Sequence, residues 1–147
     1  MCLLQRGANV TNGYVAFLLP RSWQEKMTAR LDGGRFCHCE LMFEQNDDGT
    51  WKTVSSLPKT GVRLRHVTLE GSHWVKVPVV VDADLCKAWY ALHTGQNYDW
   101  LGLVTTKLPF INGHKGKWFC SELVAALLGL SNAGSYGIED LYRYVKQ

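Results

Sequence analysis

The sequence contains no long hydrophobic run and no large excess of charge of either sign. None of its apolar stretches is long enough to span a membrane. Residues 1–10 lack the charged start and following apolar stretch of a signal peptide, so we expect synthesis in a cytoplasm. A net charge of +3 is too small to indicate a nucleic-acid partner.

The cysteines also lack the regular spacing of a disulfide or metal-binding framework. Five cysteines, an odd number without regular spacing, predict free thiols rather than disulfides. Cys37, His38 and Cys39 are adjacent, but on a strand the histidine points away from both cysteines. No second pair of ligands follows at zinc-finger spacing, so we expect no metal site.

Repeats, low-complexity tracts and linker-like segments are absent as well. A chain of 147 residues can bury a core without metal or disulfide staples, and we expect a single domain over residues 1–147. Alternating apolar residues, turn signals and helix caps indicate an α+β fold of antiparallel strands and helices. We predict strands at 10–20 (with a turn at its start), 35–45, 51–57, 61–69 and 73–81, and helices at 22–31, 82–95, 120–130 and 137–147.

Cys120 stands at the start of an apolar helix and is the first candidate for a functional side chain. The helix carries one apolar stripe, formed by Cys120, Leu123, Val124, Leu127 and Leu128, so core packing is the ordinary explanation. A helix N-terminus, however, favours an anion and lowers the pKa of a thiol placed there. Glu122 in the first turn works against a thiolate.

His38 is the best candidate for a base that would activate this thiol. Strand alternation places His38 and Glu40 on one face, where the carboxylate could hold the imidazole ring. The alternative is a solvent-exposed face with an ordinary surface histidine. His114, in a loop before Cys120, is the second candidate base. Arg63 and Arg65 alternate with apolar residues and indicate the wet face of a strand, with an anion site as the alternative.

In combination, these segments resemble the circularly permuted NlpC-type papain-like cysteine hydrolases, which include relatives of lecithin retinol acyltransferase. The resemblance covers roughly residues 14–145. It rests on the order of five segments: "FCHCELMF", "SSLPKTGVRLRHVTL", "GQNYDWLGL", "WFCSELVAALLGL" and "SYGIEDLYRYV". The last segment is similar to the ending of phage members.

The resemblance implies a papain-like fold, with an antiparallel sheet packed against helices that include the nucleophile helix. It implies Cys120 as nucleophile, His38 as base and Glu40 as the third residue, with Ser55 or Ser56 as alternatives for that third role. Tyr98 matches the Tyr-Asp of the family and would line the oxyanion site. Neither a metal nor an organic cofactor is implied.

The function implied by the resemblance is hydrolysis of a peptide or amide bond by a cysteine peptidase. The phage-like ending fits peptidoglycan as the substrate class. It also fits virion proteins as partners. Two alternatives stay open: a lipid or thioester acyl hydrolase, and a non-enzymatic structural component of a virion that keeps the hydrolase fold.

Overall fold

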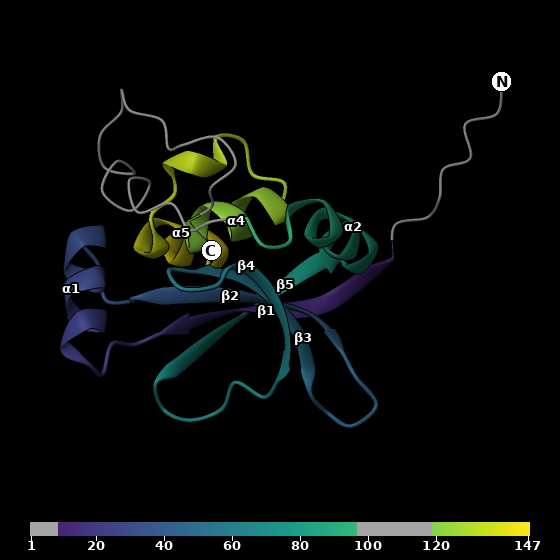
Figure 1. The fold of residues 1–147 in the computed structure, drawn as a ribbon, viewed down its shortest axis with the longest axis horizontal. Helices are drawn as coiled ribbons and strands as arrows, with labels where there is room; N and C mark the ends of the chain where they lie inside the picture. Colours follow the sequence, from purple (N-terminus) through teal and green to yellow (C-terminus); the bar gives the residue numbers. More distant parts are fainter. Residues whose placement is uncertain (1–8, 97–118) are drawn as a thin grey trace, which may run out of the picture.

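An antiparallel sheet of five strands forms the centre of the molecule. The computed structural model describes residues 9–96 and 119–147 of the chain (Figure 1). The strands are ordered β4-β3-β2-β1-β5 across the sheet. They are β1 (Val10–Leu18), β2 (His38–Gln45), β3 (Trp51–Leu57), β4 (Gly61–Val67) and β5 (Trp74–Asp82). The antiparallel α+β class and all the predicted strands are therefore confirmed.

The predicted turn at the start of β1 is wrong, and Gly13 explains why. Residues 11–13 pair with β5 as part of a continuous strand. A Cβ atom on Gly13 would lie 2.3 Å from the carbonyl oxygen of Met42 on β2. Glycine is used here because the neighbouring backbone comes close, and not because the chain turns.

The helices begin and end close to the residues that the sequence predicts. They are α1 (Trp23–Asp32), α2 (Ala83–His93), α4 (Cys120–Leu127) and α5 (Ile138–Val145), with a short 3-10 helix, η1 (Ala133–Ser135). The predicted cap Ser22 accepts a hydrogen bond from the Glu25 amide, and the Glu25 carboxylate accepts one from the Ser22 amide, at 3.2 and 2.9 Å. Gly33 ends α1 in a left-handed conformation, with φ of 76°.

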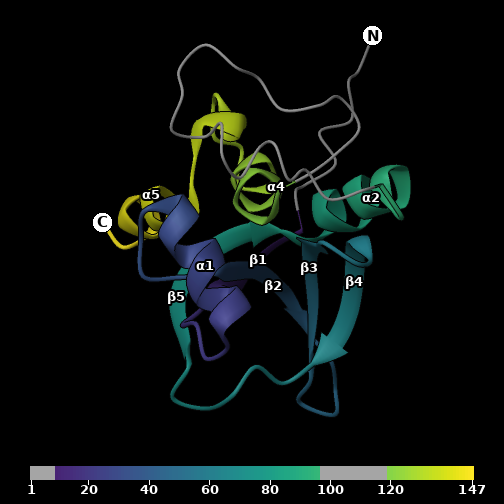
Figure 2. The same cartoon turned by 60° about the vertical axis from the view of Figure 1, so that its left-hand side comes forward.

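Helices α2, α4 and α5 lie together on one face of the sheet, and the main core lies between them and the strands (Figures 1 and 2). Alternation along β2 directs Cys39, Leu41 and Phe43 into this core, where all three are fully buried. Phe36 also enters the core, and Cys37 borders the opposite face. The prediction that Cys37 points away from His38 is wrong, because Cys37 precedes the first residue of β2 and lines the same cleft as His38.

The other face of the sheet is also covered, although by a smaller apolar cluster. Ala16, Met42 and Leu69 are buried there, and Leu69 comes from the connection between β4 and β5. Trp51 and Trp74 pack against them. Strand β2 is consequently buried on both faces, which corrects the alternative of a solvent-exposed face around His38.

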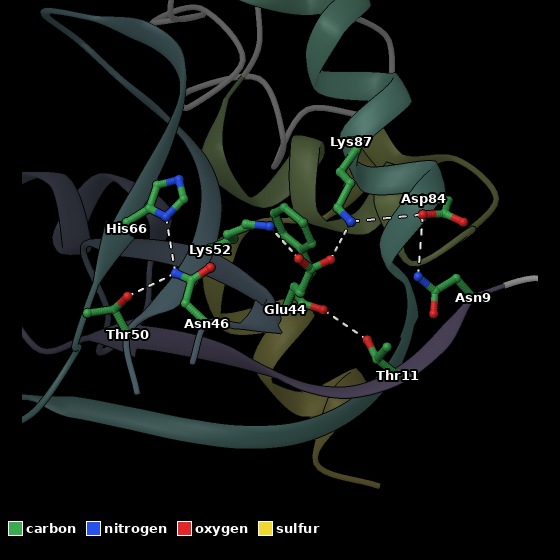
Figure 3. Close-up of polar contacts among 10 residues, drawn as sticks. Asn9, Thr11, Glu44, Asn46, Thr50, Lys52, His66, Asp84 and Lys87 are labelled. Carbon is green, nitrogen blue, oxygen red and sulfur yellow. Dashed lines mark hydrogen bonds and ion pairs between the residues drawn. The ribbon is translucent and has the colours of Figure 1, made fainter. Parts of the chain in front are cut away.

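Charged side chains connect α2 to the sheet near the last residues of β2 (Figure 3). Glu44 on β2 forms ion pairs with Lys52 on β3 and Lys87 on α2. Thr11 on β1 donates a hydrogen bond to the Phe43 carbonyl at 2.9 Å. These groups are partly exposed, so their main effect is to orient α2 rather than to stabilise the fold strongly.

The N-terminus of α5 is capped by a residue from α1. The buried carboxylate of Asp32 accepts hydrogen bonds from the amides of Ile138 and Glu139, at 3.0 and 3.2 Å. Arg35 forms an ion pair with Glu139 at 2.8 Å. Two segments more than 100 residues apart are thereby joined.

Within residues 9–96 and 119–147, no helix has both the length and the apolar character that crossing a membrane requires.

Candidate active site

The first residue of α4 lies near the first residues of β2, the central strand of the sheet. Cys120 begins α4, and Phe119 before it has no side chain that could cap the helix. The Cys120 side chain is fully buried, and its interactions with His38 and Cys39 govern the pKa of its thiol. The structure therefore brings together the two residues that the sequence analysis paired.

The imidazole of His38 lies between Cys120 and Glu40. Its Nε2 atom is 3.3 Å from Oε1 of Glu40. A carboxylate only accepts hydrogen bonds, so this contact places a proton on Nε2 and leaves Nδ1 for the sulfur. His38 is 8% exposed, and the pairing with Glu40 fixes the tautomer and orientation of a ring that is nearly enclosed.

Glu40 is a buried carboxylate surrounded by cations. It is 1% exposed, and it contacts Arg65 closely and Nη2 of Arg63 at 3.5 Å. Burial alone would raise the pKa of Glu40, but the hydrogen bond and charge of His38, with the charge of Arg65, lower it to about 2. The carboxylate is therefore ionised at neutral pH despite its burial.

Cys120 and His38 shift each other's protonation in opposite directions. Burial alone would raise the pKa of Cys120, but hydrogen bonds from Cys39 and His38, and the imidazolium charge, lower it to about 5. Burial alone would lower the pKa of His38, but hydrogen bonds to Cys120 and Glu40 raise it to about 9. Between these values the pair is a thiolate and an imidazolium.

The neighbouring cysteines remain protonated thiols. Burial raises the pKa of Cys37 to about 12 and that of Cys39 well above its ordinary value. Cys37 directs its sulfur to the Leu18 carbonyl at 3.4 Å. Among these three thiols, only Cys120 has the lowered pKa that nucleophilic chemistry requires.

A cleft of about 380 Å³ reaches this group from the side of His38. Its walls come from α1, β2, β4, the ends of β1 and β3 and the start of β5, and they include His38, Glu40, Arg63 and Arg65. Apolar side chains, among them Trp74, line the rest. Cys120 lies behind His38 and does not line the cleft.

Arg63 and Arg65 are the site residues that the sequence analysis did not assign. We expected them on a solvent face, yet their side chains are only 27% and 30% exposed and turn toward Glu40. Register explains this placement, since Arg65 pairs with Thr53, and Thr53 pairs with Met42, on the Glu40 face of β2. The spacing of two residues between them indicated that both side chains lie on the same face of a strand. It could not indicate that this face is covered by other parts of the protein.

The other candidates either form no hydrogen bond with His38 or lie outside the described residues. Ser55 and Ser56 are buried on β3, and their hydroxyls have no hydrogen-bond partner among the residues that the structure describes. Glu40 is therefore the side chain that holds the ring. Tyr98 and His114 lie outside the described residues. The described ranges contain no cluster of His, Cys, Asp or Glu that could bind a metal ion.

Comparison with known proteins found no matching family model, no similar curated protein and no similar solved structure. The function must therefore be argued from the geometry of the site itself.

Proposed function

We propose that the protein is a papain-like cysteine hydrolase of the permuted NlpC type that cleaves a peptide or amide bond. The observation that carries the proposal is the buried series Cys120, His38 and Glu40, in which the thiol has a lowered pKa and the imidazole a raised one. Core packing alone does not require a thiolate, an oriented imidazole and an ionised carboxylate in contact.

The reaction follows from these protonation states. The Cys120 thiolate attacks the carbonyl carbon, and the charge that develops on oxygen is stabilised by backbone N–H groups at the start of α4. His38 gives its Nδ1 proton to the leaving nitrogen, and a thioester forms as the C–N bond breaks. Water then attacks the thioester, His38 takes the proton, and the acid leaves. Glu40 stays ionised and stabilises the imidazolium throughout.

Peptide bonds of bacterial peptidoglycan are the substrate class that we propose, on the basis of the phage-like ending. The same thiolate could open an ester or thioester, so a lipid acyl hydrolase requires no other residues. One observation favours a non-enzymatic role in a virion: Cys120 is fully buried. The first experiment must therefore measure both the ionisation and the accessibility of this thiol.

The first test is the rate of alkylation of Cys120 by iodoacetamide between pH 4 and pH 10, located by mass spectrometry. We expect an inflection near pH 5 in the wild type, and at or above the ordinary value of about 8.5 in His38→Ala, because burial raises the pKa of the thiol once the imidazole is removed. At pH 6 the mutant should react about tenfold more slowly, because its far smaller thiolate fraction is partly offset by greater nucleophilicity.

His66→Ala is the matched control, because His66 is an exposed histidine on β4 that contacts Asn46 rather than Cys120. It should leave the inflection unchanged. Slow alkylation that does not depend on His38 would make Cys120 a packing residue and favour the structural role. If the inflection is found, release of peptides from purified peptidoglycan should be measured for the wild type and for Cys120→Ser.

A further inference from the structure

The cleft beside His38 carries more positive charge than its own carboxylate neutralises. Arg65 is the close partner of Glu40, and the Arg63 contact is longer, at 3.5 Å. The imidazolium of His38 is balanced by the thiolate of Cys120 behind it. Among the residues that the structure describes, one guanidinium charge, on the Arg63 side, is therefore left over at the inner end of the cleft.

The α1 wall of the cleft contributes one carboxylate, Glu25, but this group is already engaged. Its Oε2 atom accepts hydrogen bonds from the amides of Arg21 and Ser22, at 2.6 and 2.9 Å, as part of the cap of α1. These amide bonds are the largest cause of the lowered pKa of Glu25. Glu25 consequently serves its own helix rather than Arg63.

Each of the two arginines also has a hydrogen-bond donor without an acceptor among the described residues. The Nε atoms of Arg63 and Arg65 are buried and have no partner among the described residues. The hydroxyl of Ser55, which stands opposite Arg63 across the β3–β4 ladder, is in the same state. Buried donors of this kind are normally satisfied, and a planar guanidinium is matched in shape by a carboxylate.

We propose that the cleft binds substrates that carry a carboxylate near the scissile carbonyl, with Arg63 as the residue that selects them. The proposal rests on the proposed function. The carboxylate would accept hydrogen bonds from Arg63, and apolar parts of the substrate would contact Leu57, Pro58 and Trp74. Burial and the charge of Arg65 lower the pKa of Arg63, so a bound anion would also stabilise its cationic form.

The test uses binding, because binding does not depend on the nucleophile. The full chain with Cys120→Ser is titrated with two matched pairs of probes, followed by chemical shifts of cleft residues. Succinamate against succinamide places the carboxylate on the acyl side of the amide. N-acetylglycine against N-acetylglycinamide places it on the leaving side. We expect one carboxylate to bind roughly tenfold more tightly than its neutral partner.

Arg63→Gln in the same background should remove this preference, and Arg63→Lys should keep part of it. Arg30→Gln is the matched control, because it removes the same charge from an exposed position that does not line the cleft. Thermal melts identify any variant that fails to fold, in which case Arg63→Lys decides. Equal binding of acids and amides by the wild-type cleft, or a preference that survives Arg63→Gln, would overturn the proposal.

The two proposals fail in different ways. Loss of carboxylate preference with a normal alkylation profile of Cys120 would leave a cysteine hydrolase with neutral substrates. A preference that depends on Arg63, combined with an unreactive Cys120, would leave a carboxylate-binding protein that is not a hydrolase.

Discussion

The ionised carboxylate of Glu40 is stable in this buried position only because of the residues around it. A lone carboxylate in an enclosed position would take up a proton rather than remain charged. Here His38, Arg63 and Arg65 approach it from two strands, and His38 and Arg65 lower its pKa to about 2. The ionised form is thus maintained by neighbours rather than by solvent.

Glu40→Gln should change both the stability and its dependence on pH. The pKa of Glu40 is about 2 in the folded protein, below the value of about 4.3 expected when unfolded. Its charge therefore stabilises the fold above about pH 4.3, and this contribution is lost as the pH falls toward 2. Over this range the contribution of Glu40 to the free energy of unfolding of the wild type, measured in urea, should fall by about 3 kcal/mol.

In Glu40→Gln that loss should be absent, and stability at pH 7 should fall by about 3 kcal/mol because the arginines lose their partner. Glu70→Gln, at an exposed position, is the control and should behave as the wild type. Identical acid profiles for Glu40→Gln and the wild type would show that Glu40 does not carry the charge assigned to it.

Sequence patterns predicted part of this site, for a physical reason. Period two placed His38 and Glu40 on one face, and period 3.6 placed Cys120 at the start of a helix. These patterns state which residues share a face, but not what covers that face. The convergence of Arg63 and Arg65 on Glu40 depends on the register of three strands, which no local pattern contains.

At the scale of elements, the junction between α1 and α5 depends on one acid and one glycine. Asp32 ends α1 and caps α5. A Cβ atom on Gly137 would lie 2.6 Å from the Asp32 carboxylate, although the backbone at Gly137 has an ordinary negative φ. The predicted end of this helix at residue 31 is close to the observed end at Asp32, but the capping role across 106 residues is tertiary and could not be foreseen.

Asp32→Ala and Gly137→Ala should each destabilise the fold by about 2 kcal/mol, since each leaves the first amides of α5 without their acceptor. The measurement is urea unfolding followed by circular dichroism. Asp47→Ala, at an exposed position in the β2–β3 hairpin, is the control and should cost less than about 0.5 kcal/mol. Because both changes act on one contact, the double mutant should be less destabilised than the sum of the single mutants.

At the scale of the whole molecule, the last helix, α5, packs against the first strand and the segment before β2 and so forms part of the main core. Tyr142 on α5 packs against Phe17 on β1 and Phe36 before β2, with ring centroids 5.2 and 4.9 Å apart. Arg35 lies 4.8 Å from the Tyr142 ring centroid. The sheet and α5 should consequently unfold together rather than as separate units.

Tyr142→Ala should lower the protection of β1 and β2 amides as much as that of α5 amides, by about 3 kcal/mol. Native-state hydrogen exchange measures this directly. Tyr144→Ala is the matched control, because Tyr144 is 47% exposed on the same helix. A loss of protection confined to α5 would show that this helix opens independently of the sheet.

The double-sided burial of β2 has a consequence for how this sequence can diverge. Along most half-buried strands every second position accepts substitution freely, since one face meets water. On β2 one face builds the main core and the other presents His38 and Glu40, so neighbouring positions are constrained for unrelated reasons. A saturation library should therefore show a continuous intolerant block from His38 to Phe43, whereas β5, with exposed Val80, should alternate between tolerant and intolerant positions.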